Sequence, residues 1–332
     1  MLTFLLALPF WVKIVLLVLL VLTGLKARLV LTMGVCRSRN KLTGKTVIIT
    51  GGNSGIGKET AIDLAKRGAR VIFACRDLKR ADDARDDIIR ESGNNNVVVN
   101  QLDLASLASV RQFAFEILKN EPRLDILINN AGCVTVEKKL TDDGLEYQMQ
   151  ANYFGHFLLT NLLLGLLKKS APSRIINVTS VAHSFIKTFD LNNLNADLYH
   201  NSGSFYNSIY YYSKLSIILS TRHLAHLISQ SGVSVNCLCP GAVNTGIFRN
   251  ASSLFQTAVS ALIPIFFKTV KQGAQTTIHL AVADEVADVS GEYFSDCKIS
   301  RTSKLGKDLG LAKKLWEISE TLVKLTPEER QY

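Results

Sequence analysis

The sequence predicts an α/β protein in which one doubly wound parallel sheet is preceded by an N-terminal membrane anchor. Three observations lead to this prediction. Short β-branched runs alternate with amphipathic stretches of helical length over most of the 332 residues. The first of these runs ends in a glycine-rich turn, residues 50–57, and residues 2–25 are almost wholly apolar. Strands separated by helices pair in parallel and place a ligand across their carboxyl ends.

The expected strands and helices follow one another in a regular order after the anchor. Val47, Ile48 and Ile49 form the first strand, and helical periodicity follows over residues 59–67. No internal repeat or low-complexity tract interrupts the order, so we expect one domain of the Rossmann type. Further strands are expected at residues 71–75, 97–102, 124–129, 174–178, 233–238 and 291–295, and further helices at 106–119, 142–168 and 208–229.

Residues 1–25 are expected to form the membrane anchor. Between residues 2 and 25, seventeen residues are Leu, Ile, Val or Phe, and Lys13 is the one charge. Each of the seventeen favours insertion by roughly 0.3 to 0.6 kcal/mol, which together outweigh the cost of about 3 kcal/mol for the lysine. A cleavable signal peptide would need a basic start, a shorter apolar core and a small-residue cleavage site, and none is obvious. Pro9 and Lys13 leave a shallow interfacial helix as an alternative.

The positive charge of the chain is concentrated beside the anchor. The net charge is +10, and residues 1–58 contain eight lysines and arginines but no acidic residue, so residues 59–332 carry only +2. This distribution argues against a nucleic-acid partner and favours contact between a basic linker, residues 26–44, and anionic membrane lipid. Basic residues just after a first membrane segment place the rest of the chain in the cytosol. We expect the anchor to lie in the membrane of the endoplasmic reticulum, with a lipid droplet or a mitochondrion as the alternatives.

The six cysteines do not predict a disulfide framework or a metal site. None forms a C-x-x-C pair, and Cys237 and Cys239 alternate along an expected strand as two small buried side chains would. Reduced structural cysteines agree with a cytosolic domain. We therefore expect no bound metal.

The turn after the first strand predicts a dinucleotide-binding site. Glycine lets the backbone approach a ligand without a Cβ in the way, and the N-terminus of the following helix favours a phosphate. The glycine spacing, G-x-x-x-G-x-G, departs from the usual G-x-G-x-x-G. The turn residues expected to bind the cofactor are Gly51, Asn53, Ser54, Gly55, Ile56 and Gly57.

A tyrosine and a lysine on one expected helix supply a candidate acid–base pair. Tyr210 and Lys214 stand four residues apart, so both side chains project from the same helix face toward one ligand. Tyr211 and Tyr212 lack this spacing and are interpreted as core or pocket residues. Together with the glycine turn and the Asn-Asn-Ala-Gly turn that ends at Gly132, the pattern resembles the short-chain dehydrogenase/reductase family.

The resemblance implies a nicotinamide-dependent oxidoreductase and assigns its residues. It covers about residues 44–300, so we expect the dehydrogenase domain at 45–300 and a C-terminal helical tail at 301–332. The residues it implies in catalysis are Asn152, Ser180, Tyr210 and Lys214. Beyond the glycine turn, it implies cofactor contacts for Asn130, Ala131, Gly132, Tyr210 and Lys214, and for Pro240, Gly241 and Thr245 in a loop over the nicotinamide.

The expected chemistry depends on the tyrosine and its lysine. A free tyrosine, with a pKa near 10, is a poor acid or base at neutral pH. An ammonium about 5 Å away, at an effective dielectric constant of about 20, would stabilise the phenolate by roughly 3 kcal/mol and so lower the pKa of Tyr210. Tyr210 would exchange a proton with the substrate oxygen during hydride transfer, and Ser180 would orient that oxygen. The resemblance adds that Lys214 holds the nicotinamide ribose and that Asn152 orders a water.

The residues after the second strand predict which nicotinamide cofactor binds. NAD-specific sites usually place an acidic residue there to hold the ribose 2′-hydroxyl. Here Arg76 comes first and can pair with a 2′-phosphate, so NADP(H) is favoured, although Asp77 follows directly and leaves NAD open. Asp103, after the third strand, matches the family residue beside the adenine.

The sequence also favours a lipophilic small-molecule substrate. Ser180 lies thirty residues before Tyr210, so an insertion at about 184–207 overhangs the site. The region after Thr245 is rich in large apolar side chains, which either pack a helix or receive a lipophilic substrate from the bilayer. These side chains belong to Ile247, Phe248, Leu254, Phe255, Leu262, Ile263, Ile265, Phe266 and Phe267.

Three motifs look closest to the retinol dehydrogenases of the 11–14 type, which interconvert retinal and retinol: Thr179–His183, Tyr210–Leu215 and Gly291–Cys297. A hydroxysteroid dehydrogenase is the alternative enzyme, because sterols also suit an apolar pocket. A catalytically silent, nucleotide-binding scaffold is the alternative of a different class. The presence of Ser180, Tyr210 and Lys214 argues against a scaffold, which would not need all three. The sequence does not decide the oligomeric state, and a homodimer is possible.

Overall fold

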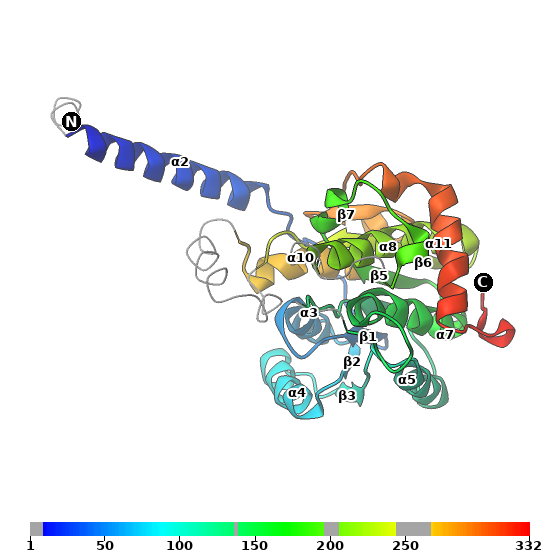
Figure 1. The fold of residues 1–332 in the computed structure, drawn as a ribbon. Coiled ribbons are helices and arrows are strands. Elements are labelled where there is room, and N and C mark those ends of the chain that lie inside the picture. Colours follow the sequence, from blue (N-terminus) through cyan, green and yellow to red (C-terminus); the bar gives the residue numbers. More distant parts are fainter. Residues whose placement is uncertain (1–8, 136–138, 196–205, 244–266) are drawn as a thin grey trace.

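The computed structural model describes residues 9–135, 139–195, 206–243 and 267–332 (Figure 1). Within these residues, eight strands form one sheet in the order β3-β2-β1-β4-β5-β6-β7-β8. All neighbours are parallel except β7 and β8. The doubly wound fold is therefore confirmed. The strands are β1 (Thr46–Thr50), β2 (Arg70–Cys75), β3 (Val97–Gln101), β4 (Ile126–Asn129), β5 (Ser173–Val178), β6 (Val233–Cys239), β7 (Tyr293–Ser295) and β8 (Lys298–Ile299).

The order of the strands reverses at β1, which lies between β2 and β4. Chain connections leave the sheet in opposite directions at such a point, and a crevice opens above the carboxyl ends of the strands. The glycine turn after β1 and the turn after β4 both lie at this crevice. The fold thus places the expected cofactor residues at the position where open α/β sheets bind ligands.

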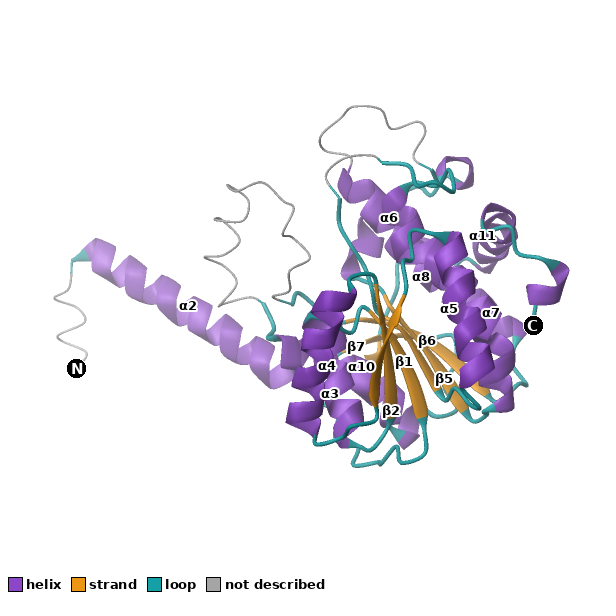
Figure 2. Ribbon diagram, turned by 90° about the horizontal axis from the view of Figure 1, so that it is seen from below, coloured by secondary structure: helices purple, strands orange, loops and turns teal. Residues whose placement is uncertain are grey.

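Helices cover both faces of the sheet (Figure 2). Both layers bury a hydrophobic core, and β1 is buried along its whole length between them. Such strands read as continuous apolar runs, which explains why Val-Ile-Ile marked this strand. One face carries α3 (Gly55–Lys66), α4 (Leu78–Ser92) and α10 (Val270–Val282), and the other carries α5 (Leu107–Asn120), α7 (Gly155–Lys169), α8 (Tyr206–Leu227) and α11 (Leu309–Leu322).

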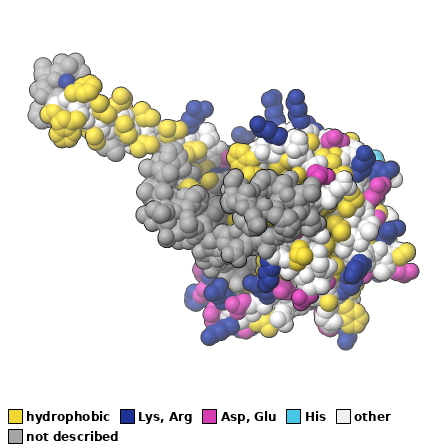
Figure 3. Space-filling model, in the orientation of Figure 1, with side chains coloured by type: hydrophobic (Ala, Val, Ile, Leu, Met, Phe, Trp, Pro, Cys, Tyr) yellow, Lys and Arg dark blue, Asp and Glu magenta, His cyan; other side chains and the backbone are white. Residues whose placement is uncertain are grey.

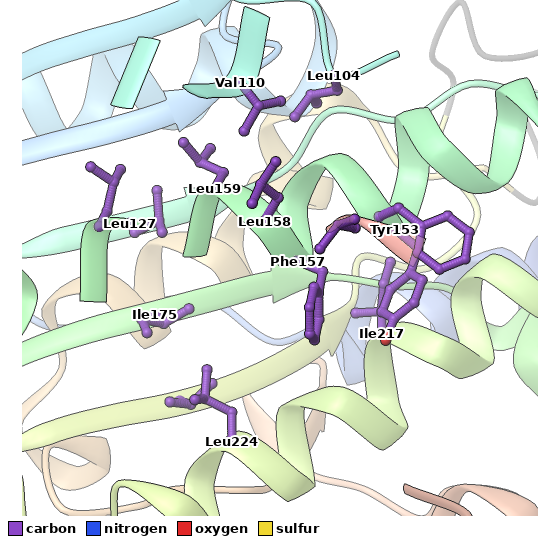
Figure 4. Close-up of a cluster of buried hydrophobic side chains, with 14 of the residues drawn as sticks. Leu104, Val110, Leu127, Tyr153, Phe157, Leu158, Leu159, Ile175, Ile217 and Leu224 are labelled. Atoms are coloured by element: carbon purple, nitrogen blue, oxygen red, sulfur yellow. The ribbon is translucent and has the colours of Figure 1, made fainter. Parts of the chain in front are cut away.

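The helix expected over residues 142–168 begins at Tyr147 and is interrupted at residues 150–154. It consists of a short α6 (Tyr147–Met149), a π-helical turn (Gln150–Phe154) and α7. π-helical turns inside helices are rare and often found at functional sites. This one carries Asn152 on its buried side, and the aromatic residues after it, Tyr153 and Phe157, pack into the core (Figure 4).

The apolar N-terminal segment forms α2 (Phe10–Thr32), which extends past the expected end of the anchor at residue 25. Among the described residues it is the one helix long and apolar enough to cross a membrane, and none of that apolar stretch is buried. In Figure 3, α2 stands apart from the domain as a rod of apolar side chains. The helix is consistent with a membrane anchor.

The expected C-terminal tail is packed onto the domain. Trp316 of α11 contacts Phe157 of α7 at a ring-centroid distance of 4.6 Å. Beyond α11, the carboxylate of Glu329 accepts a hydrogen bond of 2.9 Å from Arg111 of α5. This end of the chain covers α7 and α8 and shares their core.

Candidate active site

The glycine turn between β1 and α3 forms the floor of the crevice. Gly51 has a φ of +67°, which favours glycine, and a Cβ there would lie 3.0 Å from the Cα of Ala131. A Cβ at Gly57 would overlap the carbonyl oxygen of Gly51, so α3 begins directly on the turn. Ser54 is the N-cap residue of α3, and its side chain makes no capping hydrogen bond. The first N–H groups of the helix therefore remain available to a phosphate.

A cleft of about 540 Å³ lies above this turn, within the size range of cofactor sites. It collects residues from the carboxyl ends of four strands and from α6. The expected cofactor residues that line it are Gly51, Asn53, Ser54, Arg76, Asp103, Ala131 and Gly132. Gly55, Ile56 and Gly57 form the first turn of α3 beside it. The structure thus brings most of the expected cofactor residues together.

Asn130 joins the two turns to each other. Its side-chain Nδ2 donates to the carbonyl oxygens of Thr50, over 2.9 Å, and of Gly51, over 3.3 Å. Its backbone N–H donates to Thr50 Oγ1 over 2.9 Å. The Asn130 amide is therefore engaged in holding the glycine turn, and the cofactor contact expected for it stays a prediction.

Ser180, Tyr210 and Lys214 meet at the ends of β5 and α8. The Ser180 side chain lies close enough to the Tyr210 hydroxyl to act on it and favour a lower pKa. Lys214 Nζ lies 5.5 Å from the centroid of the Tyr210 ring and donates to the Val178 carbonyl oxygen over 3.1 Å. Thr179 Oγ1 donates to the Lys214 carbonyl over 2.7 Å and so fixes α8 against the end of β5. The three side chains are assembled as one unit.

Burial reverses the pKa shift expected for Tyr210. It raises the pKa of Tyr210 to about 12, although the Ser180 side chain acts in the opposite direction. Burial also lowers the pKa of Lys214 to about 8. The expectation of a lowered tyrosine pKa is therefore wrong for this cleft, because loss of solvation penalises the phenolate more than Ser180 stabilises it. At neutral pH, Tyr210 is a protonated hydrogen-bond donor.

Asn152 is bound to the turn that follows β4. Its Oδ1 accepts the Cys133 N–H over 2.8 Å, and its Nδ2 donates to the Cys133 carbonyl over 3.0 Å and to Ser213 Oγ over 3.2 Å. A Cβ at Gly132 would lie 3.5 Å from Asn152 Oδ1 and 3.4 Å from Lys214 Nζ. Asn152 is thus placed beside the lysine, and its expected role in ordering a water stays a prediction.

His156 gave no signal in the sequence, since it lies among apolar residues of a helix. Its Nδ1 lies 3.0 Å from the Asn152 carbonyl oxygen, which only accepts, so Nδ1 carries the proton. Its Nε2 then accepts the hydroxyl hydrogen of Thr50 over 2.8 Å. Thr50 Oγ1 in turn accepts the N–H groups of Asn130 and Ala131. The buried imidazole therefore ties the π-helical turn to both cofactor turns.

The loop after β6 and the expected insertion are described in part. Gly241 follows Pro240 at the end of β6 and has a φ of +87°. Phe185, at the start of the insertion, packs on Tyr211 at a ring-centroid distance of 5.4 Å, and Tyr212 is buried in the core, as expected of both tyrosines. Outside the described residues lie Thr245, the part of the insertion at 196–205 and all the expected apolar residues from Ile247 to Phe266.

Comparisons with known proteins agree with this geometry. A model of the short chain dehydrogenase family matches residues 45–188. Human retinol dehydrogenase 13 is 45% identical to this chain, over 89% of the chain and 89% of its own length. The chain belongs to the short-chain dehydrogenase family.

Other relatives show the same family membership over nearly the whole chain. Human retinol dehydrogenase 14 is 46% identical over 85% of this chain and 87% of its own length. Among solved structures, an uncharacterised protein from Mycobacterium paratuberculosis matches with a TM-score of 0.70 and 31% identity, covering 88% of this chain and 98% of its own. The RhlG/NADP complex from Pseudomonas aeruginosa matches with a TM-score of 0.60 and 28% identity, covering 82% and 98%.

Short-chain dehydrogenases are oxidoreductases that use a nicotinamide cofactor, and the cleft fits one. The open N-terminus of α3 suits the pyrophosphate. The small residues at Gly51, Ala131 and Gly132 leave room that larger side chains would fill. Lys214 Nζ would lie 3.4 Å from a Cβ at Gly132, so the lysine borders the turn after β4 that lines the cleft.

Proposed function

We propose that this protein is a membrane-anchored, NADP(H)-dependent oxidoreductase that interconverts retinal and retinol. The observation that carries the proposal is the assembled Ser180–Tyr210–Lys214 unit beside a dinucleotide cleft. It occurs in a chain that is 41% to 46% identical to proteins named retinol dehydrogenases 11 to 14. A shared family sets the reaction class, and identity at this level supports the substrate class.

The preference for NADP(H) is supported by the charges at the end of β2. Arg76 lines the cleft, and its Nη1 donates to the Tyr147 hydroxyl over 2.6 Å, which holds the guanidinium at the cleft edge. Asp77 Oδ1 accepts the Arg80 N–H over 3.1 Å as the N-cap of α4. The aspartate therefore caps its own helix, while the arginine stays at the cleft edge, where it would pair with the 2′-phosphate of a bound cofactor.

The proposed proton transfer uses the Tyr210 hydroxyl. A bound NADPH supplies the hydride to the carbonyl carbon. Tyr210, protonated at neutral pH, donates its proton to the carbonyl oxygen, and Ser180 hydrogen-bonds the same oxygen and orients it. The Lys214 ammonium, near the tyrosine ring, stabilises the negative charge that develops on the phenol oxygen. For alcohol oxidation the same groups act in reverse.

A lipophilic substrate is supported by the surface next to the catalytic residues. Val181 and Phe185 follow Ser180 directly in a short 3-10 helix, and their side chains are 54% and 63% exposed. Phe185 contacts Tyr211, whose ring is 6.4 Å from that of Tyr210. Exposed apolar side chains this close to the acid–base pair suit a hydrocarbon chain.

The proposal includes a place in the cell. With α2 in a membrane, the basic residues after it favour a cytosolic catalytic domain in contact with anionic lipid. The endoplasmic reticulum is the proposed membrane. A glycosylation tag at either end of the chain tests the topology, because a glycosylated C-terminus would overturn the cytosolic placement.

NADPH consumption by membranes that contain the full-length protein tests the function. We expect oxidation with all-trans-retinal and little with a short aldehyde. A preference for a steroid ketone would favour a hydroxysteroid dehydrogenase, and NADPH binding without turnover on any of the three would favour a scaffold. Tyr210→Phe should lower turnover at least about a hundredfold while NADPH still binds. Tyr332→Phe, which removes a hydroxyl that accepts a hydrogen bond from Trp316 outside the cleft, is the matched control.

A further inference from the structure

The chain that leaves α2 is docked on the catalytic domain. The Cys36 N–H donates to Gln275 Oε1 of α10 over 3.1 Å. Ser38 Oγ and Asn40 Nδ2 both donate to the Val282 carbonyl oxygen at the end of α10, over 3.2 Å and 2.9 Å. This part of the expected linker therefore follows α10 through defined hydrogen bonds.

Gly34 brings this docked segment against the turn between β7 and β8. Its N–H donates to Asp296 Oδ1 over 3.2 Å. A Cβ at Gly34 would overlap the carbonyl group of Asp296, so only glycine permits this approach. Asp296 has a φ of +50°, a left-handed conformation that Asp and Asn adopt more readily than most residues. The turn thus holds the Asp296 carboxylate in a fixed place.

The same carboxylate oxygen binds a lysine at the cofactor loop. Lys268 Nζ lies 2.6 Å from Asp296 Oδ1, and the lysine side chain is only 12% exposed. The ammonium also donates to the Pro240 carbonyl oxygen over 3.1 Å. A Cβ at Gly241 would lie 2.9 Å from Lys268 Nζ, so the ammonium lies directly against this loop. Lys268 therefore connects Asp296 to the loop after β6.

From this chain of contacts we propose that Asp296 and Lys268 are positioning residues, which fix the Pro240–Gly241 loop for NADP(H) and connect it to the segment that leaves α2. The inference rests on the proposed function, which assigns this loop to the nicotinamide end of the cofactor. A loop that is ordered before binding lowers the entropy cost of binding. Without the carboxylate, a mostly buried ammonium loses its counter-charge beside Gly241, and the loop must move to solvate it.

The test measures the dissociation constant of NADPH by its fluorescence, with the full-length protein in nanodiscs. Asp296→Asn keeps the shape of the side chain and its tolerance of a positive φ, and Lys268→Met keeps most of the length of the lysine. We expect each substitution to raise the dissociation constant about fivefold. The double variant should bind NADPH as tightly as either single variant, because the pair acts as a unit. The KM for NADPH should rise more than the KM for retinal.

The connection to the membrane side is tested at Gly34. Gly34→Ala should also weaken NADPH binding, by about threefold, although Gly34 contacts Asp296 and not the cofactor loop. Gly24→Ala is the matched control, because no atom lies within 4 Å of a Cβ at that position of α2. Asp82→Asn is the matched control for Asp296→Asn, since it breaks the exposed 2.9 Å ion pair with Arg85 in α4. Both controls should bind NADPH like the unchanged protein.

The outcomes separate this inference from the proposed function. If Lys268→Met and Gly34→Ala leave the affinity for NADPH unchanged, the inference is overturned and the proposed function is not. The same holds if the loss of binding free energy in the double variant is the sum of the losses in the two single variants. Lys268→Met and Gly34→Ala decide the matter even where Asp296→Asn does not fold. Weaker binding that appears only together with a lowered melting temperature indicates general damage and also overturns it. An unchanged protein that does not bind NADPH overturns the proposed function and this inference together.

Discussion

His183 is hydrogen-bonded to the Ser180 backbone, with its Nδ1 at 2.7 Å from the Ser180 carbonyl oxygen. On the other side of the ring, Nε2 accepts the N–H of Ser303 over 3.3 Å. A carbonyl only accepts and an N–H only donates, so the imidazole carries its proton on Nδ1. Burial lowers the pKa of His183 and keeps the ring neutral. The segment after β8 thus supports Ser180, the residue proposed to orient the substrate oxygen.

Replacing His183 should therefore slow catalysis without weakening cofactor binding. His183→Phe keeps a ring against Tyr293, 5.2 Å away, but removes both hydrogen bonds. We expect kcat for retinal reduction to fall about tenfold, because the Ser180 carbonyl keeps only the 3.3 Å hydrogen bond from the His183 backbone N–H and the loop shifts. The dissociation constant of NADPH should stay the same. His223→Phe, beside Trp316, is the control, and an unchanged kcat in His183→Phe would contradict the positioning role.

Retinal reduction should decline at alkaline pH because of Lys214. Its buried ammonium has a pKa lowered to about 8, so the positive charge beside Tyr210 is lost as the pH rises through that value. We expect kcat/KM, which reports the groups of the free enzyme, to be level near neutral pH and to fall above about 8. Tyr210 titrates far higher and does not cause this fall. In Lys214→Arg the fall should move to higher pH, and the same fall in that variant would refute the assignment.

His156 should make the protein less stable in acid. Burial lowers its pKa from 6.5 to about 4, so between these values the unfolded state binds more protons than the folded state. The free energy of unfolding therefore decreases as the pH falls through this window, by up to about 3 kcal/mol, and is unaffected above it. Denaturation at pH 7.5 and pH 5 tests this. The decrease should be smaller in His156→Gln, and an equal decrease in both proteins would rule out His156 as its source.

Tyr147 should contribute to the choice between NADPH and NADH. Tyr147→Phe removes only the hydroxyl that accepts the hydrogen bond from Arg76. The guanidinium then loses its fixed position at the cleft edge, and we expect the dissociation constant of NADPH to rise about fivefold. NADH, which lacks the 2′-phosphate, serves as the matched ligand and should bind as before. An equal loss for both cofactors would show that Tyr147 supports the cleft in general.

The sequence could predict those parts of the site that depend on local geometry. Tyr210 and Lys214 are brought together by one turn of helix, and the glycines after β1 are required by the close approach of Ala131 to Gly51. Contacts between segments far apart in the sequence could not be predicted from it. The pairing of His183 with Ser303 joins residues 120 positions apart, and nothing near either residue marks it.

Two further features depended on environment more than on residue type. The spacing of Tyr210 and Lys214 suggested a lowered tyrosine pKa, yet the depth of burial decides the sign, and depth follows from packing. The sequence predicts a continuous helix where the π-helical turn lies, because the residues around Asn152 have ordinary helical periodicity. The side-chain hydrogen bonds of Asn152 to Cys133 are specified by the tertiary fold.

The short distance between α2 and the docked segment limits how the domain can move. α2 ends at Thr32 and Gly34 is already bound to Asp296, so Met33 alone connects them. One residue spans at most about 3.6 Å. With α2 in a bilayer, the connection would keep the Gly34–Asp296 contact close to the end of that helix. Encounters with a substrate dissolved in the membrane would then take place near the point where α2 leaves the bilayer.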